Sequence, residues 1–523
     1  MKSDVKSQQL RTEANRLYVH QKFYDALLKY NESLCAAESE SENMGLAFAN
    51  RSAVYFEMKL YDKCLSNIEL AKKNCYPEKN LEILKKRENK CLQLLKQNDD
   101  ANQCEDFLSS FELSYPGNDE LPFIANCLEM EVDSKYGRYI VTKRHLKVGD
   151  IVAIDEPTFK VIKADSRYST CYDSNVFQRC GGCMKENLLG LIPCTSCCRT
   201  MYCSIDCMKS SHKRHHKYEC EIVDELLTSG IMHIVVRMLL EGLSLFDGDI
   251  HEMEKFLTQH TEPMTIFNLN SKSWKSVEGR RKMFLAALSL PSCVSDEKVD
   301  LENYENIFMK TKKLKGLWNS NESFIRKILV KLVHVGTHYV HGIGGWSLNQ
   351  KFNEEEPKNP SFYQQLNGNG LYLFCSLLNH SCAPNIKRLN VDDKVVVIVS
   401  RPIEKGEQLF DSYRPNFNNQ AKTIRQEALM KDYGFVCDCE ACYNDWPLNH
   451  NLNVFSEELL EFAWGLHEEL PFMTVADAKK MLYKCYDAIA QHHEHFPSAE
   501  LIVLQECVSN CLILITKPSL QFP

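Results

Sequence analysis

The sequence predicts a multi-domain α+β protein, on three observations. Its 523 residues exceed what one hydrophobic core usually holds, about 250–300 residues. Residues 13–34 and 47–71 have the apolar spacing of helical hairpins, whereas alternating apolar residues at 151–154 and 395–400 favour short strands. Cysteines cluster at 180–220 and 437–442, where metal ligands rather than apolar side chains are expected to stabilise the fold.

The N-terminal segment contains two helical units with matching anchor residues. Ala14, Tyr18, Phe23, Ala26 and Tyr30 correspond to Ser52, Phe56, Tyr61, Cys64 and Ile68. Small residues where helices cross, with aromatic residues between them, resemble tetratricopeptide repeats. We therefore predict a repeat region at 1–98, with a partial third unit at 77–95, and a linker at 99–130 that is introduced by polar residues 97–100. An unrelated helical hairpin is the alternative.

Residues 180–220 have ligand spacing for two zinc ions. Seven cysteines and one histidine supply the eight ligands: Cys180, Cys183, Cys194, Cys197, Cys203, Cys207, His216 and Cys220. The pattern resembles a MYND finger. That resemblance implies cross-braced sites, with Cys180, Cys183, Cys203 and Cys207 around one ion and Cys194, Cys197, His216 and Cys220 around the other. Both sites would be closed, and closed four-ligand sites are structural.

Alternatives to this ligand set remain within the finger. Cys198 adjoins Cys197 and offers a second register, and His212 is a fallback ligand. Otherwise we expect His212 and His215 to lie at the solvated surface. A disulfide framework is disfavoured, because we recognise no signal peptide and the His-Cys pair matches zinc spacing.

A third zinc site is predicted in the C-terminal half. Cys437, Cys439 and Cys442 supply three thiolates, and Cys382 completes the tetrahedral set. Three unrelated thiols are the alternative. The prediction is therefore three structural zinc ions.

Three strings together resemble the active site of a SET-domain lysine methyltransferase. They are NHSCAPN at 379–385, GEQLFDSY at 406–413 and CDCEAC at 437–442. With the repeats and the finger, the chain is most similar to SET and MYND methyltransferases that carry an N-terminal tetratricopeptide region. The resemblance implies transfer of a methyl group from S-adenosylmethionine to a lysine of histone or non-histone proteins.

The resemblance also implies roles for individual residues. Tyr413 and Tyr433 would line the lysine channel as catalytic residues. Contacts to S-adenosylmethionine would come from Tyr136, Gly137, Arg138, Asn379, His380, Tyr413 and Phe435.

The implied domain order is a split SET domain with two insertions. Its halves are residues 131–179 and 366–415, separated by the finger at 180–220 and a helical insert at 221–365; a post-SET segment at 416–445 and a helical lobe at 446–523 follow. Within this frame, residues 371–378 are predicted as a strand.

Two positions depart from the family pattern: Lys135 replaces the first glycine of Gly-x-Gly, and Thr337 stands where an asparagine is usual. The C-terminal lobe, about eighty residues, is short. These departures favour the alternative function, a catalytically weak adaptor that recruits partners through the finger and the repeats.

Partners are predicted for each module. Arg11, Asn15 and Asn50 resemble the carboxylate clamp of co-chaperone repeats, which implies an acidic heat-shock chaperone tail as ligand. The finger implies proline-rich or corepressor peptides. A net charge of -8 disfavours direct nucleic-acid binding. The most apolar candidate helix, 231–246, is interrupted by His233, Arg237 and Glu241, so no membrane span is predicted. We expect the protein in cytoplasm and nucleus.

Overall fold

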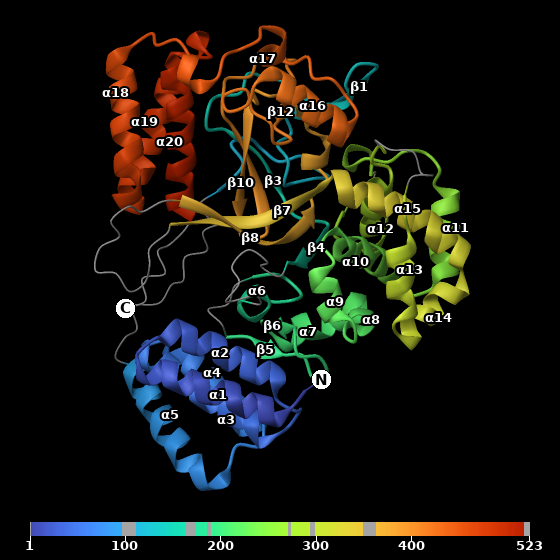
Figure 1. Cartoon of the computed structure of the whole chain (residues 1–523), viewed down its shortest axis with the longest axis vertical. Helices are drawn as coiled ribbons and strands as arrows, with labels where there is room; N and C mark the ends of the chain where they lie inside the picture. The colour runs from blue at the N-terminus through green and yellow to red at the C-terminus, as the bar shows by residue number, and fades with distance from the viewer. Residues whose placement is uncertain are drawn as a thin grey trace.

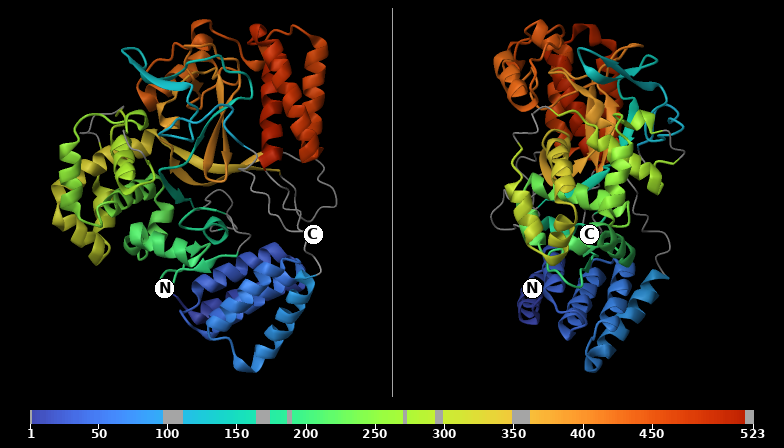
Figure 2. Two further views of the ribbon diagram at one scale, coloured as in Figure 1. Left: turned by 180° about the vertical axis from the view of Figure 1, so that it is seen from behind. Right: turned by 90° about the vertical axis from the view of Figure 1, so that its right-hand side faces the viewer.

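The helical repeats and the β-rich core lie at opposite ends of an elongated molecule (Figure 1). This computed structural model describes residues 2–96, 111–163, 174–185, 190–269, 273–292, 299–348 and 362–516. The cysteine-rich finger lies between the two ends, and three C-terminal helices flank the core (Figure 2). The predicted polar linker start, residues 97–100, lies outside the described residues.

The predicted repeat hairpins are confirmed. Ser3 caps the first helix, which begins earlier than the repeat pattern indicates. The corresponding anchor residues of the two units make equivalent contacts. The Tyr18 and Phe23 rings lie 6.0 Å apart, and the Phe56 and Tyr61 rings lie 5.9 Å apart. The helices are α1 (Asp4–Val19), α2 (Phe23–Ala36), α3 (Glu42–Glu57), α4 (Tyr61–Lys73) and, in the partial third unit, α5 (Leu81–Leu95).

The β-rich core consists of small sheets built from distant segments. A hairpin of β1 (Leu128–Asp133) and β2 (Gly137–Thr142) precedes the antiparallel sheet β10 (Ile386–Val391), β11 (Lys394–Val399) and β3 (Ile151–Asp155). A second antiparallel sheet contains β4 (Phe159–Ile162), β8 (Phe362–Leu371) and β7 (Val340–Leu348). Finally, β9 (Asn379–His380) pairs in parallel with β12 (Phe410–Asp411). The described part of the predicted linker, from residue 111, packs against this core through buried Leu121 and Ile124.

Two secondary-structure predictions were wrong. The predicted strand at 371–378 is instead the end of β8 followed by a 3-10 turn, η6 (Cys375–Leu377), whose first N–H donates to Asp155 at 3.0 Å. The insert is not helical throughout, since β7 lies within it. The hairpin of β7 and β8 is rich in glycine, so it lacks the alternating apolar pattern that predicts a strand. Close packing requires glycine at Gly368, where a Cβ would lie 2.3 Å from the Val161 carbonyl oxygen.

Helices surround the core and the finger. A short helix, α6 (Ser174–Gln178), leads into the finger, which contains β5 (Ile192–Pro193), β6 (Met201–Tyr202), α7 (Ile205–Ser211), the π-turn η3 (His212–His216) and α8 (Lys217–Glu219). The insert contains α9 (Val223–Thr228), α10 (Ile231–Ser244), α11 (Ile250–Gln259), α12 (Val277–Leu288), α13 (Glu302–Met309), α14 (Lys312–Ser320) and α15 (Glu322–His338). The tail contains α16 (Lys422–Tyr433), α17 (Glu440–Tyr443), α18 (Glu457–Glu469), α19 (Val475–Gln491) and α20 (Ala499–Thr516).

Buried charges join the finger to α10. Arg237 donates two hydrogen bonds of 2.6 Å to the Glu219 carboxylate and a third, of 3.1 Å, to the Lys160 carbonyl. His215 Nδ1 lies 2.8 Å from Glu241. The expectation that His215 is solvated was therefore wrong; its side chain is buried because Glu241 reaches it from α10. Arg237 and Glu241 interrupt the apolar pattern of this helix. Both are buried because each pairs with a residue of the finger, Arg237 with Glu219 and Glu241 with His215.

Polar contacts also fix the repeats to the finger. The buried Arg51 guanidinium donates to the Leu191 carbonyl at 2.7 Å, and Asn31 donates to the Phe177 carbonyl at 2.8 Å. Ser39 donates to the Thr195 carbonyl at 2.8 Å. The side of the finger formed by β5 and its flanking loops is thus an internal docking surface for the repeats.

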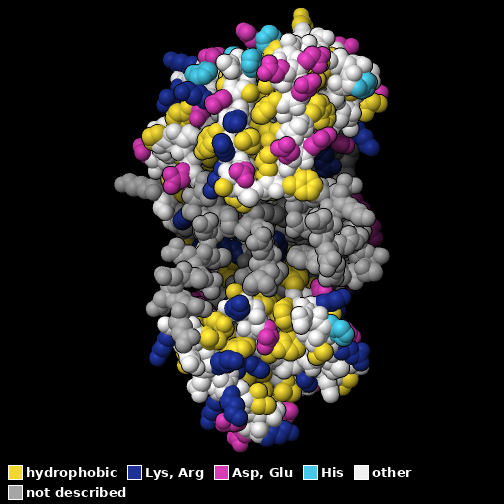
Figure 3. Space-filling view, turned by 90° about the vertical axis from the view of Figure 1, so that its left-hand side faces the viewer, with side chains coloured by type: hydrophobic (Ala, Val, Ile, Leu, Met, Phe, Trp, Pro, Cys, Tyr) yellow, Lys and Arg dark blue, Asp and Glu magenta, His cyan; other side chains and the backbone are white. Residues whose placement is uncertain are grey.

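The C-terminal lobe covers one face of the sheet β10-β11-β3. Leu389, Val396 and Ile398 pack against α18–α20 in one apolar cluster. By length and composition α20 is apolar enough to cross a membrane, with a mean hydropathy of 1.6, but 61% of it is buried within the fold. It was wrong to take residues 231–246 as the most apolar helix. Figure 3 shows hydrophobic, basic and acidic side chains interleaved on the outer face of this lobe.

Replacing Arg237 with Met should strongly destabilise the contact between the finger and α10. The substitution leaves the Glu219 carboxylate buried without its main partner, which costs about 3–5 kcal/mol. The matched control is Lys73→Met in the exposed Lys73–Glu69 pair, where the loss should be at most about 0.5 kcal/mol. Thermal denaturation and limited proteolysis measure both variants. Equal melting temperatures would show that the buried pair contributes no more than the surface pair.

Candidate active site and metal centres

The predicted ligand sets come together as three separate clusters. They are Cys180, Cys183, Cys203 and Cys207; Cys194, Cys197, His216 and Cys220; and Cys382, Cys437, Cys439 and Cys442. Within each cluster the ligand atoms all lie within 4.8 Å of one another. Cys198 and His212 belong to none of these groups in the described part of the chain.

The spacing within the clusters fits tetrahedral zinc. Zn–S bonds of about 2.3 Å place two thiolates about 3.8 Å apart. Cys183 and Cys203 Sγ lie 3.6 Å apart, Cys194 and Cys220 Sγ lie 3.9 Å apart, and Cys382 Sγ lies 3.6 Å from Cys442 Sγ. The structure therefore contains three cysteine-rich candidate zinc sites with the predicted partition of ligands.

The turn between β1 and β2 lies next to Asn379. The Asn379 amide donates to the carbonyl oxygens of Tyr136 at 3.2 Å and Arg138 at 3.3 Å. Gly137 has a φ of 65°, and a Cβ there would meet no atom within 4 Å. The positive φ explains the glycine, and the open space beside it leaves the backbone accessible. The Arg138 side chain points to the insert instead, where it donates to the Ser289 carbonyl at 3.1 Å.

His380 connects the third cysteine cluster to Tyr413. Its Nδ1 accepts the Tyr413 backbone N–H at 3.0 Å, so the ring proton belongs on Nε2, which lies 3.3 Å from Cys382 Sγ. Burial lowers the pKa of His380 to about 4, which keeps the ring neutral. The imidazole therefore positions the backbone of Tyr413 relative to the cluster.

Aromatic residues assemble around Tyr413. The Tyr413 and Tyr433 rings lie 4.8 Å apart, and Phe435 lies 6.2 Å from the His380 ring. The Tyr413 hydroxyl donates to the Leu378 carbonyl at 2.9 Å. Burial raises the pKa of Tyr413, so the phenol stays protonated at neutral pH. Its oxygen is left as an acceptor that can orient an amine.

These residues line a cavity of about 1170 Å³. Asn379, Tyr413, Tyr433 and Phe435, all predicted site residues, contribute to its wall. The other predicted residues are outside this lining: Tyr136, Gly137 and Arg138 adjoin it through Asn379, and His380 adjoins it through Tyr413. The volume is large enough for a cofactor together with part of a second substrate.

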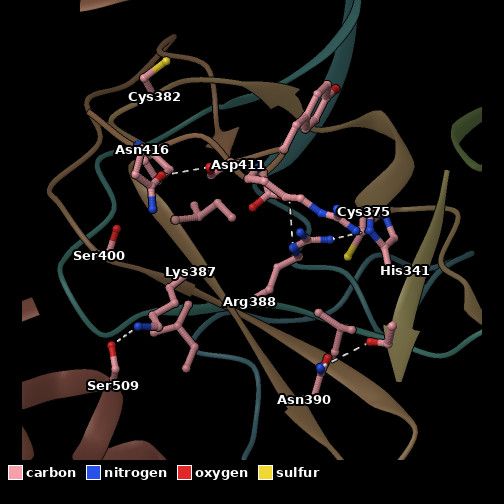
Figure 4. Close-up of a pocket in the computed structure, with 18 of the residues that line it drawn as sticks. His341, Cys375, Cys382, Lys387, Arg388, Asn390, Ser400, Asp411, Asn416 and Ser509 are labelled. Atoms are coloured by element: carbon pink, nitrogen blue, oxygen red, sulfur yellow. Dashed lines mark hydrogen bonds and ion pairs between the residues drawn. The ribbon is translucent and has the colours of Figure 1, made fainter. Parts of the chain in front are cut away.

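Sequence reasoning missed a polar chain in this cavity (Figure 4). Arg388 Nε lies 2.9 Å from the Asp411 carboxylate, and Arg388 Nη1 donates to His341 Nδ1 at 2.8 Å. Asp411 lies within the string that ends at Tyr413, so that motif contained a signal for it. No sequence motif pointed to Arg388 or His341, because each is one polar residue within a strand.

The two departures from the family pattern have defined positions. Lys135 Nζ lies 2.9 Å from the carboxylate of Asp438, the residue between Cys437 and Cys439 in the sequence, so an exposed ion pair joins the β1–β2 turn to the third cluster. Thr337 lines the cavity, but its hydroxyl donates to the Val333 carbonyl at 2.8 Å. A threonine here supplies no free amide to the cavity.

Comparisons with known proteins agree with this geometry. A family model described as the SET domain matches residues 137–414. The protein-lysine N-methyltransferase SMYD4 of Danio rerio is 21% identical over 505 residues, covering 85% of this chain and 66% of the relative. The Homo sapiens protein of that name is 22% identical over 544 residues, with coverage of 83% and 66%. The SET domain and MYND-type zinc finger protein 6 of Schizosaccharomyces pombe is 25% identical over 327 residues, with coverage of 62% and 53%. The chain thus spans slightly less than two thirds of the length of the Danio rerio and Homo sapiens relatives.

Proposed function

This chain belongs to the SET domain family, and we propose that it is a protein-lysine N-methyltransferase that uses S-adenosylmethionine. One observation carries the proposal: β9 and β12 pair in parallel and bring Asn379 close to Tyr413, and both residues line one cavity together with Tyr433 and Phe435. When bound, S-adenosylmethionine supplies an electrophilic methyl group on a sulfonium. The relatives' printed names support the same activity.

Residues on three segments would hold the donor. The β1–β2 turn offers backbone groups at Tyr136, Gly137 and Arg138, with open space at Gly137. Asn379 holds this turn against β9, and Phe435 supplies an aromatic face on the cavity wall. His380, which is outside the cavity lining, would contribute indirectly, because its ring positions the backbone of Tyr413.

The acceptor lysine must lose its proton before it can attack. Free lysine has a pKa of about 10.4, and burial between the Tyr413 and Tyr433 rings would lower that value by desolvation. The Tyr413 oxygen would accept a hydrogen bond from the amine and orient its lone pair toward the methyl group. Neither phenol is a strong base, so positioning supplies the acceleration.

Replacing Tyr413 with Phe tests this role. The substitution removes one hydroxyl and keeps the ring, so folding and metal content should survive. Loss of a preorganised hydrogen bond should cost on the order of 2 kcal/mol, about thirtyfold in turnover. The measurement is methyl transfer to a cell-extract substrate pool, with Tyr443→Phe, an exposed tyrosine, as the matched control.

The alternative function, an adaptor with a non-catalytic SET fold, gives a different result. In that case transfer is equal in wild type and Tyr413→Phe, or absent from both although calorimetry shows bound donor. Either outcome would replace the enzyme proposal with the adaptor.

We also propose that each cysteine-rich cluster binds one structural zinc ion. Each has four protein ligands, which leaves no open coordination position for catalysis.

Elemental analysis should find three zinc ions per chain. Cys439→Ser should lower this to two and weaken donor binding, because Cys382 of the same cluster contacts His380. Cys183→Ser should also lower the number of zinc ions, but it should unfold mainly the finger. A stoichiometry of two that Cys439→Ser leaves unchanged would remove the third site.

The repeat region supports a proposal for a partner, an acidic chaperone tail. Asn15 Oδ1 accepts from Asn50 at 2.8 Å and from the Tyr30 hydroxyl at 2.7 Å, so the two clamp asparagines adjoin. Arg11, one turn away on α1, donates to Asn43 at 3.2 Å. This arrangement leaves the Asn15 amide nitrogen as a donor for a carboxylate. Proline-rich or corepressor peptides at the finger, and residence in cytoplasm and nucleus, remain predictions.

Asn15→Ala should weaken binding of an acidic C-terminal chaperone peptide. The substitution removes the donor and also disturbs Asn50, so affinity should fall at least tenfold, about 1.4 kcal/mol. Fluorescence anisotropy with a labelled peptide measures this, and Asn80→Ala outside the clamp is the control. Absence of binding to wild type at high micromolar peptide would end this proposal.

A further inference from the structure

The cavity extends beyond the tyrosines to the C-terminal lobe. Its lining includes Tyr413 and Tyr433 and continues to Lys387 on β10 and to Glu506 and Ser509 on α20. Figure 4 shows Lys387 reaching toward Ser509 at the end of the pocket next to that helix. Because β10 is an edge strand of its sheet, the cavity can pass around it.

Consecutive side chains of β10 meet different partners. Side chains alternate between the two faces of a strand, so Lys387 and Arg388 point in opposite directions. Arg388 pairs with Asp411 at 2.9 Å, on the side of the sheet that carries Tyr413. Lys387 faces α20 and therefore cannot place its own amine beside Tyr413 as a methyl acceptor.

The Lys387 ammonium has no direct counter-ion among the described residues. Its hydrogen-bond partner is the Ser509 hydroxyl, which donates its own proton to the Gln505 carbonyl at 2.7 Å. No carboxylate within the described ranges lies within ion-pair distance, 4.0 Å, of Lys387 Nζ. Burial lowers the pKa of Lys387 to about 8, and Glu506 opposes this only in part. An enclosed cation without an anion is costly, so an anionic ligand would be bound favourably.

A second donor lies in the same pocket. Asn416 accepts from the Ser412 hydroxyl at 2.8 Å through Oδ1, which leaves its amide hydrogens to donate. Figure 4 shows the Asn416 amide nitrogen directed into the pocket. The lining as a whole is basic although the chain is acidic, with Lys163, Lys387, Arg388 and Arg414 against Asp411 and Glu506.

We propose that Lys387, assisted by Asn416, is a specificity-determining anion subsite that binds an acidic side chain near the acceptor lysine of the substrate protein. The proposal rests on the proposed methyltransferase function, because the substrate segment is placed by its lysine at Tyr413. A carboxylate or a phosphorylated side chain would complete the missing ion pair, and a basic side chain would be rejected.

The test uses full-length, zinc-loaded protein and peptide libraries with a central lysine. Each flanking position in turn is fixed as Glu, Gln, Lys or phosphoserine, and methyl incorporation is measured together with binding by fluorescence anisotropy. Wild type should favour Glu, phosphoserine or both over Gln at least tenfold at one or two positions, since desolvated charge pairs are strong. The phosphoserine library distinguishes the two anions.

Substitutions at Lys387 assign that preference to one residue. Lys387→Met should bring the acidic-to-Gln ratio to about one, and Lys387→Arg should keep most of it. Folding should survive, because an apolar replacement removes a half-buried charge that has no direct counter-ion among the described residues. Zinc content and melting temperature check this. The control is Lys405→Met, an exposed lysine outside the cavity, which should keep the wild-type ratio.

The outcomes separate the two proposals. Wild type could bind acidic libraries better than Gln libraries and yet transfer no methyl group. If only Lys387→Met then loses the acidic preference, the subsite stands and the enzyme proposal fails. If transfer occurs without an acidic preference, or the preference persists in Lys387→Met, the subsite is overturned. Absence of both binding and transfer overturns it as well.

Discussion

The site depends on His380, whose ring holds two parts of the chain at once. One nitrogen accepts the Tyr413 N–H, and the other lies 3.3 Å from Cys382 in the third cysteine cluster. Because the ring is buried and neutral, it fixes both contacts in one tautomer. The position of Tyr413 is therefore tied to the cluster, and the cluster is closed by residues more than fifty positions further along the chain.

An apolar core runs continuously from the repeats through the finger and the insert to the β-rich core, and buried polar contacts within it orient the modules. Arg237 crosses from α10 to the finger and to β4, and Arg51 crosses from the repeats to the finger. Such contacts are directional and lose much of their energy if a partner moves. They therefore set the orientation of neighbouring modules more sharply than apolar packing alone would.

The C-terminal lobe has two roles although it is short. Its three helices cover the sheet face that Leu389, Val396 and Ile398 present, and α20 also supplies one wall of the cavity. Because α20 is largely buried among its neighbours, most of its residues are apolar. Its composition therefore resembles that of a membrane-spanning helix. The cavity exists because this lobe meets the edge of the sheet.

The sequence by itself determined the modules and their chemistry. Ligand spacing predicted the twelve zinc ligands, and repeat anchors predicted both hairpins. The resemblance to MYND fingers and SET domains implied how the finger ligands divide and that Asn379, His380 and Tyr413 meet. These features are local or contain distinctive residue types, so a pattern can identify them.

Tertiary structure alone decided what depends on pairing between distant segments. The hairpin of β7 and β8 was missed because its glycines have no periodic signal, and His215 is buried only because Glu241 arrives from another helix. Lys387 and Arg388 are adjacent cations that no sequence pattern distinguishes. The sheet separates them, since alternation places Arg388 against Asp411 and leaves Lys387 facing α20, with no ion-pair partner among the residues that the structure describes.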